Sequence, residues 1–138
     1  MQHGIFKVMK KQVIALILTA LFMLISCSKE NELLDVPIQM RDGINLLTDI
    51  YIPEGEGPFP VILSRVPYGT KSDYILQPFY GEYFNERGYV YVSQNVRGKF
   101  GSEGIFTAYV EGQEILDAYD TIDWIVSQEW SDGNVGVM

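Results

Sequence analysis

The feature that most constrains the fold is a regular alternation of strand-like and helix-like segments after residue 36. Strands that alternate with helices indicate an α/β protein, in which helices cover both faces of a mostly parallel sheet. The last strand begins at Val135, close to the end of the sequence, so we expect an incomplete domain. The expected strands are 37–40, 45–53, 59–66, 89–96 and 135 onward, of which 59–66 and 89–96 are expected to be buried. A short helical stretch interrupted by Pro78 ends at 86–88, a second helix spans 111–128, and 130–134 is expected to form a turn.

Local patterns support this assignment. Asp42 and Gly43 supply the positive φ that a tight hairpin turn needs, and the strand that follows alternates as at a sheet edge wetted on one side. The apolar run 61–63 suits a strand buried on both faces. The last helix has apolar residues at steps of four, three and four, which indicates one apolar face made of Ile115, Tyr119, Ile122 and Val126, with Leu116 and Ile125 beside them.

The N-terminal segment has the pattern of a bacterial export signal. Residues 1–11 carry three lysines and no acidic residue, and 13–25 are apolar except for Thr19. This run is shorter than the roughly 20 residues of a membrane-spanning helix. The residues ending at Cys27 resemble a lipoprotein box, in which the cysteine receives a diacylglycerol. We expect a signal peptide at 1–26, lipidation of Cys27, a tether at 27–36 and an exported, membrane-anchored protein of the periplasm or cell surface; the alternative is an incidental thiol after an uncleaved anchor.

Composition excludes several classes of function. All 18 acidic residues follow Cys27, whereas three of the 10 basic residues precede it, so the processed chain is strongly acidic and repels a phosphate backbone. His3 is the only histidine and would be lost with the signal peptide, and Cys27 is the only cysteine and would carry the lipid. The processed chain would therefore have neither a disulfide framework nor an imidazole base. The acidic residues lack calcium-loop spacing. The glycine-rich segment 98–104 lacks the ending of a phosphate-binding loop and is expected to turn the chain instead. We therefore expect no nucleic-acid partner, no metal and no cofactor.

Seven short strings occur in the order and spacing of one enzyme family. They are MRDG (40–43) with TDIY (48–51), GPFPV (57–61), RVPYG (65–69), YF (83–84) with ERGY (86–89), NVRG (95–98) with GSEG (101–104), YDTIDW (119–124) and WSDGNVG (130–136). Together they resemble the X-prolyl dipeptidyl-peptidase and cocaine-esterase-like serine hydrolases, which include glutaryl and α-amino-acid ester acylases. The resemblance implies that residues 37–138 form the N-terminal part of an α/β-hydrolase fold, with an antiparallel hairpin leading into a mostly parallel sheet with flanking helices.

The same resemblance implies a Ser-Asp-His triad that lies outside the sequence. The serine is expected about three residues beyond Met138, on a strand-to-helix elbow, with the aspartate and histidine further on. Tyr68 matches the tyrosine whose hydroxyl donates to the oxyanion in this family; the alternative is that its ring only packs on the loop. Ser102 is not expected to be a nucleophile, because Phe100 stands where an elbow has glycine, and its hydroxyl is expected to satisfy nearby backbone groups.

Arg97 and Asp120 also match positions typical of this family, but a structural role is expected for each. Arg97 at a strand exit is expected to bind loop carbonyls, and Asp120 within a helix is expected to face solvent or pair locally. Asp73 follows the Tyr68 loop, where family members that act on free amino groups place acids. Because Gly69 and Thr70 follow Tyr68 directly, the sequence disfavours a requirement for an amine.

These observations predict an exported serine hydrolase that cleaves ester or amide bonds of small-molecule or peptide substrates through an acyl-enzyme. The 138 residues alone are expected to be inactive, since the triad is absent from them. The main alternative is a truncated, non-catalytic lipoprotein that uses the half-fold for binding, and a carbohydrate-binding surface lipoprotein is a third.

Overall fold

The computed structural model describes residues 31–71, 77–107 and 112–138. The predicted signal peptide at 1–26, the predicted lipidation site Cys27 and the acid Asp73 lie outside these residues. Within the described part of the chain, no helix is both long enough and apolar enough to cross a membrane.

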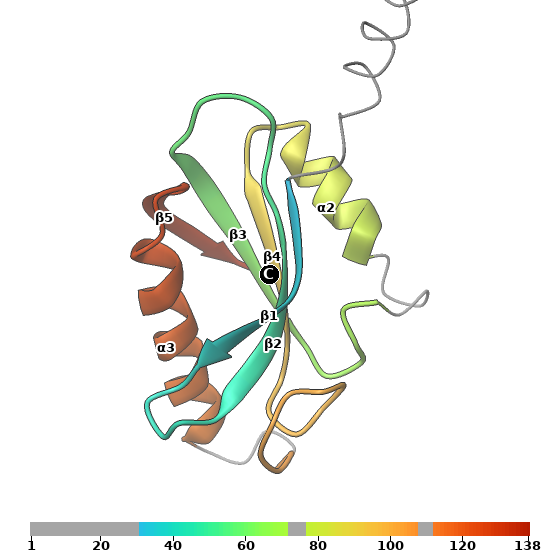
Figure 1. The fold of residues 1–138 in the computed structure, drawn as a ribbon, viewed down its shortest axis with the longest axis vertical. Helices are drawn as coiled ribbons and strands as arrows, with labels where there is room; N and C mark the ends of the chain where they lie inside the picture. The colour runs from blue at the N-terminus through green and yellow to red at the C-terminus, as the bar shows by residue number, and fades with distance from the viewer. Residues whose placement is uncertain (1–30, 72–76, 108–111) are drawn as a thin grey trace, which may run out of the picture. The chain divides into compact units, whose positions relative to one another are not determined.

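Five strands and two helices make up the described fold. The strands are β1 (Glu32–Gln39), β2 (Asn45–Tyr51), β3 (Phe59–Val66), β4 (Val90–Asn95) and β5 (Ser131–Val137); the helices are α2 (Gln77–Asn85) and α3 (Gln113–Val126). The strands form one mixed sheet in the order β1-β2-β4-β3-β5 (Figure 1). β1 and β2 form the predicted antiparallel hairpin, β2 is antiparallel to β4, and β3 is parallel to both β4 and β5. The predicted α/β class is confirmed.

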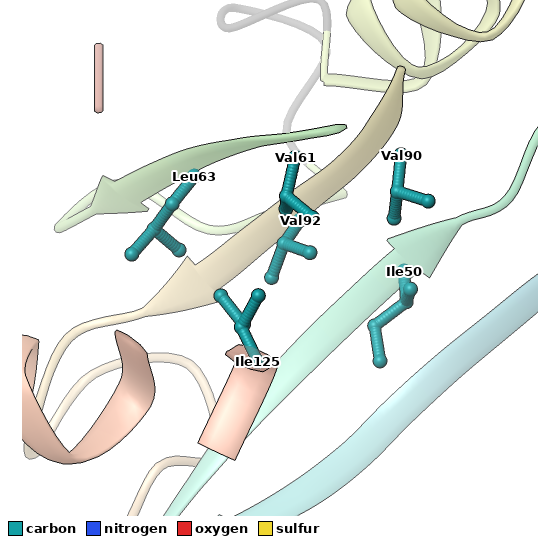
Figure 2. Close-up of a cluster of buried hydrophobic side chains, with 6 residues drawn as sticks. All are labelled: Ile50, Val61, Leu63, Val90, Val92 and Ile125. Carbon is teal, nitrogen blue, oxygen red and sulfur yellow. The ribbon is translucent and has the colours of Figure 1, made fainter. Parts of the chain in front are cut away.

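One face of the sheet packs against α3. Apolar side chains from three neighbouring strands surround Ile125 of the helix, which is fully buried (Figure 2). Along β4 these are Val90 and Val92, whereas Tyr91 between them points to the other face, as strand geometry requires. Every residue of β4 is buried, which confirms the prediction of a buried strand there. The remaining members of this cluster are Ile50, Val61 and Leu63.

The opposite face of the sheet is covered by α2 (Figure 1). This layer is rich in aromatic rings. Phe84 of α2 stacks on Tyr91 with 5.4 Å between ring centroids. Gly81 lies directly over Tyr51, and a Cβ at this position would lie 2.6 Å from the tyrosine ring, so the close approach of the helix requires glycine. Burial in this layer raises the pKa of Tyr51 to about 12.

The start of the sheet and helix α2 differ from the prediction in three respects. β1 begins at Glu32, so residues 32–36 belong to the sheet, and the prediction of a tether that reaches residue 36 is wrong for them. β2 is an inner strand, paired with β1 and β4, and not the wetted edge that its alternation indicated. Pro78 does not interrupt α2 but is its second residue, a position where the missing N–H of proline costs no helical hydrogen bond.

The buried face of α3 is not the apolar face that the sequence predicted. Ile115, Tyr119 and Val126 are exposed, whereas Asp117 and Thr121 are fully buried beside Ile125. The two polar residues face the sheet because they find partners there: the Thr121 hydroxyl donates to Gln94 Oε1 at 3.0 Å, and Asp117 accepts hydrogen bonds from Arg97. The helix itself lies within the predicted range of 111–128.

The last strand begins earlier than predicted. β5 already starts at Ser131, inside the segment expected to be a turn. A turn-like irregularity is nevertheless present, since Gly133 has φ of +86° and the Asn134 N–H donates to Asp132 Oδ1 at 2.8 Å. The pairing of β5 with β3 shifts register at this point, so the strand contains the predicted turn.

Candidate active site

Tyr68 lies where two parallel strands end. It is the second residue after β3, whose last residue, Val66, pairs with Asn95 at the end of β4. Open α/β sheets bind ligands at the carboxyl ends of their strands. The Tyr68 residue is 65% exposed and borders a pocket of about 540 Å³. In the described part of the chain, this pocket is also lined by Asp35, Gly69, Thr70, Lys71, Asn95 and Phe100.

The loop that carries Tyr68 is fixed against the loop after β4. Gly69 has φ of +95°, in the left-handed region that favours glycine. A Cβ on Gly69 would lie 2.9 Å from Cδ1 of Phe100, so the phenyl ring can lie against the loop only because this residue has no side chain. One residue later, the Thr70 N–H donates to Asn95 Oδ1 at 2.9 Å. The chain is therefore held at Gly69 and at Thr70, immediately after Tyr68.

Phe100 adds a second exposed ring to the pocket. Its φ of 46° is left-handed, a conformation that costs an ordinary residue about 1 to 2 kcal/mol. The carbonyl oxygen of this strained residue lies 3.4 Å from Asn95 Nδ2. The residue is 59% exposed. Such strained positions are concentrated at functional sites, and an exposed ring offers a surface for the apolar part of a ligand.

The charges at the pocket are paired with each other. The Lys71 ammonium forms an ion pair with the Asp35 carboxylate, and the hydrogen bond from Lys71 Nζ to Asp35 raises the pKa of the lysine. The backbone N–H of Asp35 donates to Asp49 Oδ1 at 2.8 Å, which ties this part of β1 to β2. Asp35 has φ of 56° and lies within the register shift of β1. Among the described residues, the pocket wall therefore carries one ammonium and one carboxylate that neutralise each other.

Arg97, just after β4, binds two carboxylates and not the loop carbonyls that the sequence analysis expected. Its Nη2 lies 2.7 Å from Oδ1 of the fully buried Asp117, and its Nη1 lies 2.8 Å from Oδ2 of Asp42 in the β1–β2 turn. The hydrogen bonds with Asp117 and Asp42 raise the pKa of Arg97, and the Arg97 hydrogen bond lowers the pKa of Asp42. Arg97 thus joins the hairpin turn, the end of β4 and α3.

Asp120 also has a structural partner, but a distant one. Its carboxylate accepts from the Arg41 backbone N–H at 2.8 Å and from Arg41 Nη2 at 2.6 Å. The hydrogen bond from the arginine side chain lowers the pKa of Asp120. The expectation that this acid faces solvent or pairs locally is therefore wrong, because its partner lies in the hairpin turn at the other end of the described chain.

Ser102 has the structural role that the sequence predicted. Its hydroxyl donates to the Asn95 carbonyl oxygen at 2.8 Å and accepts from the Leu47 N–H at 2.9 Å. It is buried, away from the exposed surface that a nucleophile needs. Gly98, Gly101 and Gly104 all have positive φ, which confirms that this segment is a series of turns. Over the described ranges, His, Cys, Asp and Glu side chains form no group of three that could hold a metal ion.

The sequence of these elements matches a known family. The model of the X-Pro dipeptidyl-peptidase (S15) family matches residues 42–138, which include Tyr68 and the strands on which the pocket is built. This chain belongs to that family. Among curated relatives, the cocaine esterase of Rhodococcus sp. (strain MB1 Bresler) is 41% identical over 111 residues. That match covers 75% of this chain but only 18% of the esterase, so the chain spans less than a fifth of its relative.

Solved structures of hydrolases share the fold. A CocE/NonD family hydrolase from Staphylococcus aureus superposes with a TM-score of 0.67 at 29% identity, covering 77% of this chain and 22% of that one. An α-amino acid ester hydrolase superposes with a TM-score of 0.65 at 33% identity, covering 81% and 22%. The mixed sheet with its flanking helices therefore matches the N-terminal part of a CocE/NonD-type α/β hydrolase.

Sequence reasoning singled out Tyr68 but missed its neighbours in the pocket. Asn95 was noted only as part of the string 95–98, and Phe100 only as the residue that excludes a nucleophile elbow at Ser102, although both lie beside the tyrosine loop. One signal could have found Asn95: parallel strands end at the same edge, so the ends of 59–66 and 89–96 were bound to meet. Asp35 and Lys71 gave no such signal, since they meet only through the irregular path of β1.

Proposed function

We propose that the protein of which these 138 residues form part is an exported serine hydrolase that cleaves ester or amide bonds through an acyl-enzyme, with Tyr68 in its oxyanion hole. The observation that carries this proposal is the exposed Tyr68 at the carboxyl ends of β3 and β4, beside a pocket, in a chain of the S15 family. The names of the cocaine esterase and the α-amino acid ester hydrolase favour an ester among the substrates.

The proposed chemistry needs groups from both inside and outside the described residues. A serine hydroxyl attacks the substrate carbonyl, a histidine takes its proton, and the carbonyl oxygen becomes an oxyanion. The Tyr68 hydroxyl donates a hydrogen bond to that oxygen, where negative charge develops in the transition state. Collapse of the intermediate breaks the bond to the leaving group, which receives the proton, and water then hydrolyses the acyl-enzyme. We place the serine in a Gly-x-Ser-x-x-Gly string encoded within about ten residues after Met138.

Labelling with a fluorophosphonate tests the nucleophile. The complete protein should label, and changing the serine of the Gly-x-Ser-x-x-Gly string to alanine should abolish labelling. Ser102→Ala is the matched control and should label like the parent, since Ser102 is buried and occupied by backbone partners. A stop codon directly after Met138, the absence of such a serine, or labelling that depends on Ser102 would contradict the proposal.

We further propose that the protein is a lipoprotein anchored through Cys27. The proposal is supported by the apolar run at 13–25 that ends in the lipoprotein-like box. In a bacterial host the parent should incorporate radioactive palmitate and partition with membranes, whereas Cys27→Ala should incorporate none. Equal incorporation by both proteins would exclude Cys27 as the acceptor.

A further inference from the structure

Asn95 occupies a central position beneath the candidate site. It is the last residue of β4, which lies between β2 and β3, and it is only 3% exposed. Its backbone pairs with Val66, the last residue of β3 before the Tyr68 loop. A polar side chain so deeply buried needs hydrogen-bond partners, and those partners identify its role.

The side-chain amide of Asn95 joins the two loops that form the pocket. Its Oδ1 accepts from the Thr70 N–H at 2.9 Å, and Thr70 is itself only 2% exposed. Its Nδ2 lies 3.5 Å from Thr70 Oγ1 and 3.4 Å from the Phe100 carbonyl oxygen. The short bond to Thr70 is therefore the dominant interaction, and the two longer contacts orient the amide toward Phe100. An apolar side chain of the same size would leave the Thr70 N–H buried without a partner.

These contacts determine how Tyr68 is presented. The loop leaves the sheet at Val66 and is fixed again at Thr70, with Gly69 held between Tyr68 and the Phe100 ring. Tyr68 lies between the two fixed points, so the position of its hydroxyl depends on the bond at Thr70. We propose that Asn95 is a positioning residue that sets the Tyr68 hydroxyl for the oxyanion by holding Thr70. This inference rests on the proposed role of Tyr68 as oxyanion donor.

Two variants of the complete protein separate the hydrogen bond from the bulk of the side chain. Asn95→Leu removes the acceptor and should lower kcat about tenfold with KM within about twofold of the parent, because a displaced donor weakens transition-state stabilisation more than substrate binding. Asn95→Asp keeps an oxygen that can accept from the Thr70 N–H and should return kcat to within about threefold of the parent. Equal losses in both variants would overturn the inference.

A double-mutant cycle with Tyr68→Phe distinguishes this inference from the function on which it rests. If Asn95 acts through the Tyr68 hydroxyl, Asn95→Leu should change kcat less than about twofold once that hydroxyl is gone. The same tenfold loss in both backgrounds would overturn the positioning role and leave the oxyanion role intact. An unchanged kcat in Tyr68→Phe alone would instead refute the oxyanion role and with it the inference.

Hydrogen exchange keeps the inference testable if Asn95→Leu does not fold. In the unmodified protein the Thr70 amide should exchange at least about tenfold more slowly than an unprotected amide, because it is buried and bonded to Asn95. Asn95→Asp should retain that protection. Rapid exchange of the Thr70 amide in the unmodified protein would show that the loop is not held at this point, and would overturn the proposal.

Discussion

Replacing Tyr68 by phenylalanine in the complete protein is expected to lower kcat about a hundredfold while KM stays near the parent value. The substitution keeps the ring but removes the hydroxyl that we place against the oxyanion. One oxyanion-hole donor contributes about 3 kcal/mol to transition-state stabilisation, and the ground-state carbonyl depends on it far less. Steady-state kinetics with an ester substrate measures both constants.

Tyr119→Phe is the matched control for this experiment. Tyr119 is exposed to nearly the same extent as Tyr68 but lies on α3, away from the pocket, so its hydroxyl should contribute nothing to kcat. An unchanged kcat in Tyr68→Phe would refute the oxyanion role. A loss that appears equally in Tyr119→Phe would point to a general effect on the fold.

Replacing Arg97 by alanine should be the most destabilising single change at the ion pairs described above. Asp117 is fully buried and would lose both hydrogen bonds from the guanidinium. Among the described residues, Asp117 would keep only the hydrogen bond from Gln113 Nε2 at 2.9 Å and the more distant Arg65 Nη2 at 3.8 Å. Removing the main partner of a buried carboxylate costs about 3 kcal/mol in free energy of unfolding. Urea denaturation followed by the fluorescence of Trp124 and Trp130, which pack beside the core, measures this change.

Two further variants test the cause of that loss. Arg41→Ala breaks the exposed pair with Asp120 and should shift the urea midpoint far less, since solvent screens that interaction. The double variant Arg97→Met with Asp117→Leu removes both charges and should recover much of the stability lost in Arg97→Ala. A double variant that is less stable than Arg97→Ala would show that the loss of stability in Arg97→Ala does not come from the charge left on Asp117.

The strands and helices could be predicted where one physical signal dominates. The run around Val61 and the first half of the strand 89–96 followed from their content of valine and other apolar residues, because a strand covered by helices on both sides favours apolar residues on both faces. The second half of β4 is polar and nevertheless buried. The face of α3 could not be predicted in this way. Its pattern indicated that Ile115 and Tyr119 were buried, but Asp117 and Thr121 are, because their partners come from β4 and the segment after it.

The candidate site was predictable only in part. Tyr68 was found through the resemblance of its local string to a family, not through any physical property of a tyrosine on a loop. Asn95 and Phe100 join Tyr68 through tertiary contacts: a hydrogen bond to Thr70 and a ring against Gly69. Such contacts depend on the path of two loops that are about 25 residues apart in the chain, and local sequence patterns carry no information about that distance.

The position of β4 in the sheet has a consequence for the order of events on the ribosome. Three strands, β1, β2 and β3, emerge before β4, yet β2 and β3 do not pair with each other in the finished sheet. A nascent chain that has emerged only to Val66 can therefore form the hairpin, but β3 has no permanent neighbour. The sheet closes when β4 inserts between two earlier segments, antiparallel to one and parallel to the other. Until then the apolar β3 must be kept from pairing with the wrong edge, so the interval between the emergence of Val66 and that of Asn95 is one in which the chain is open to aggregation.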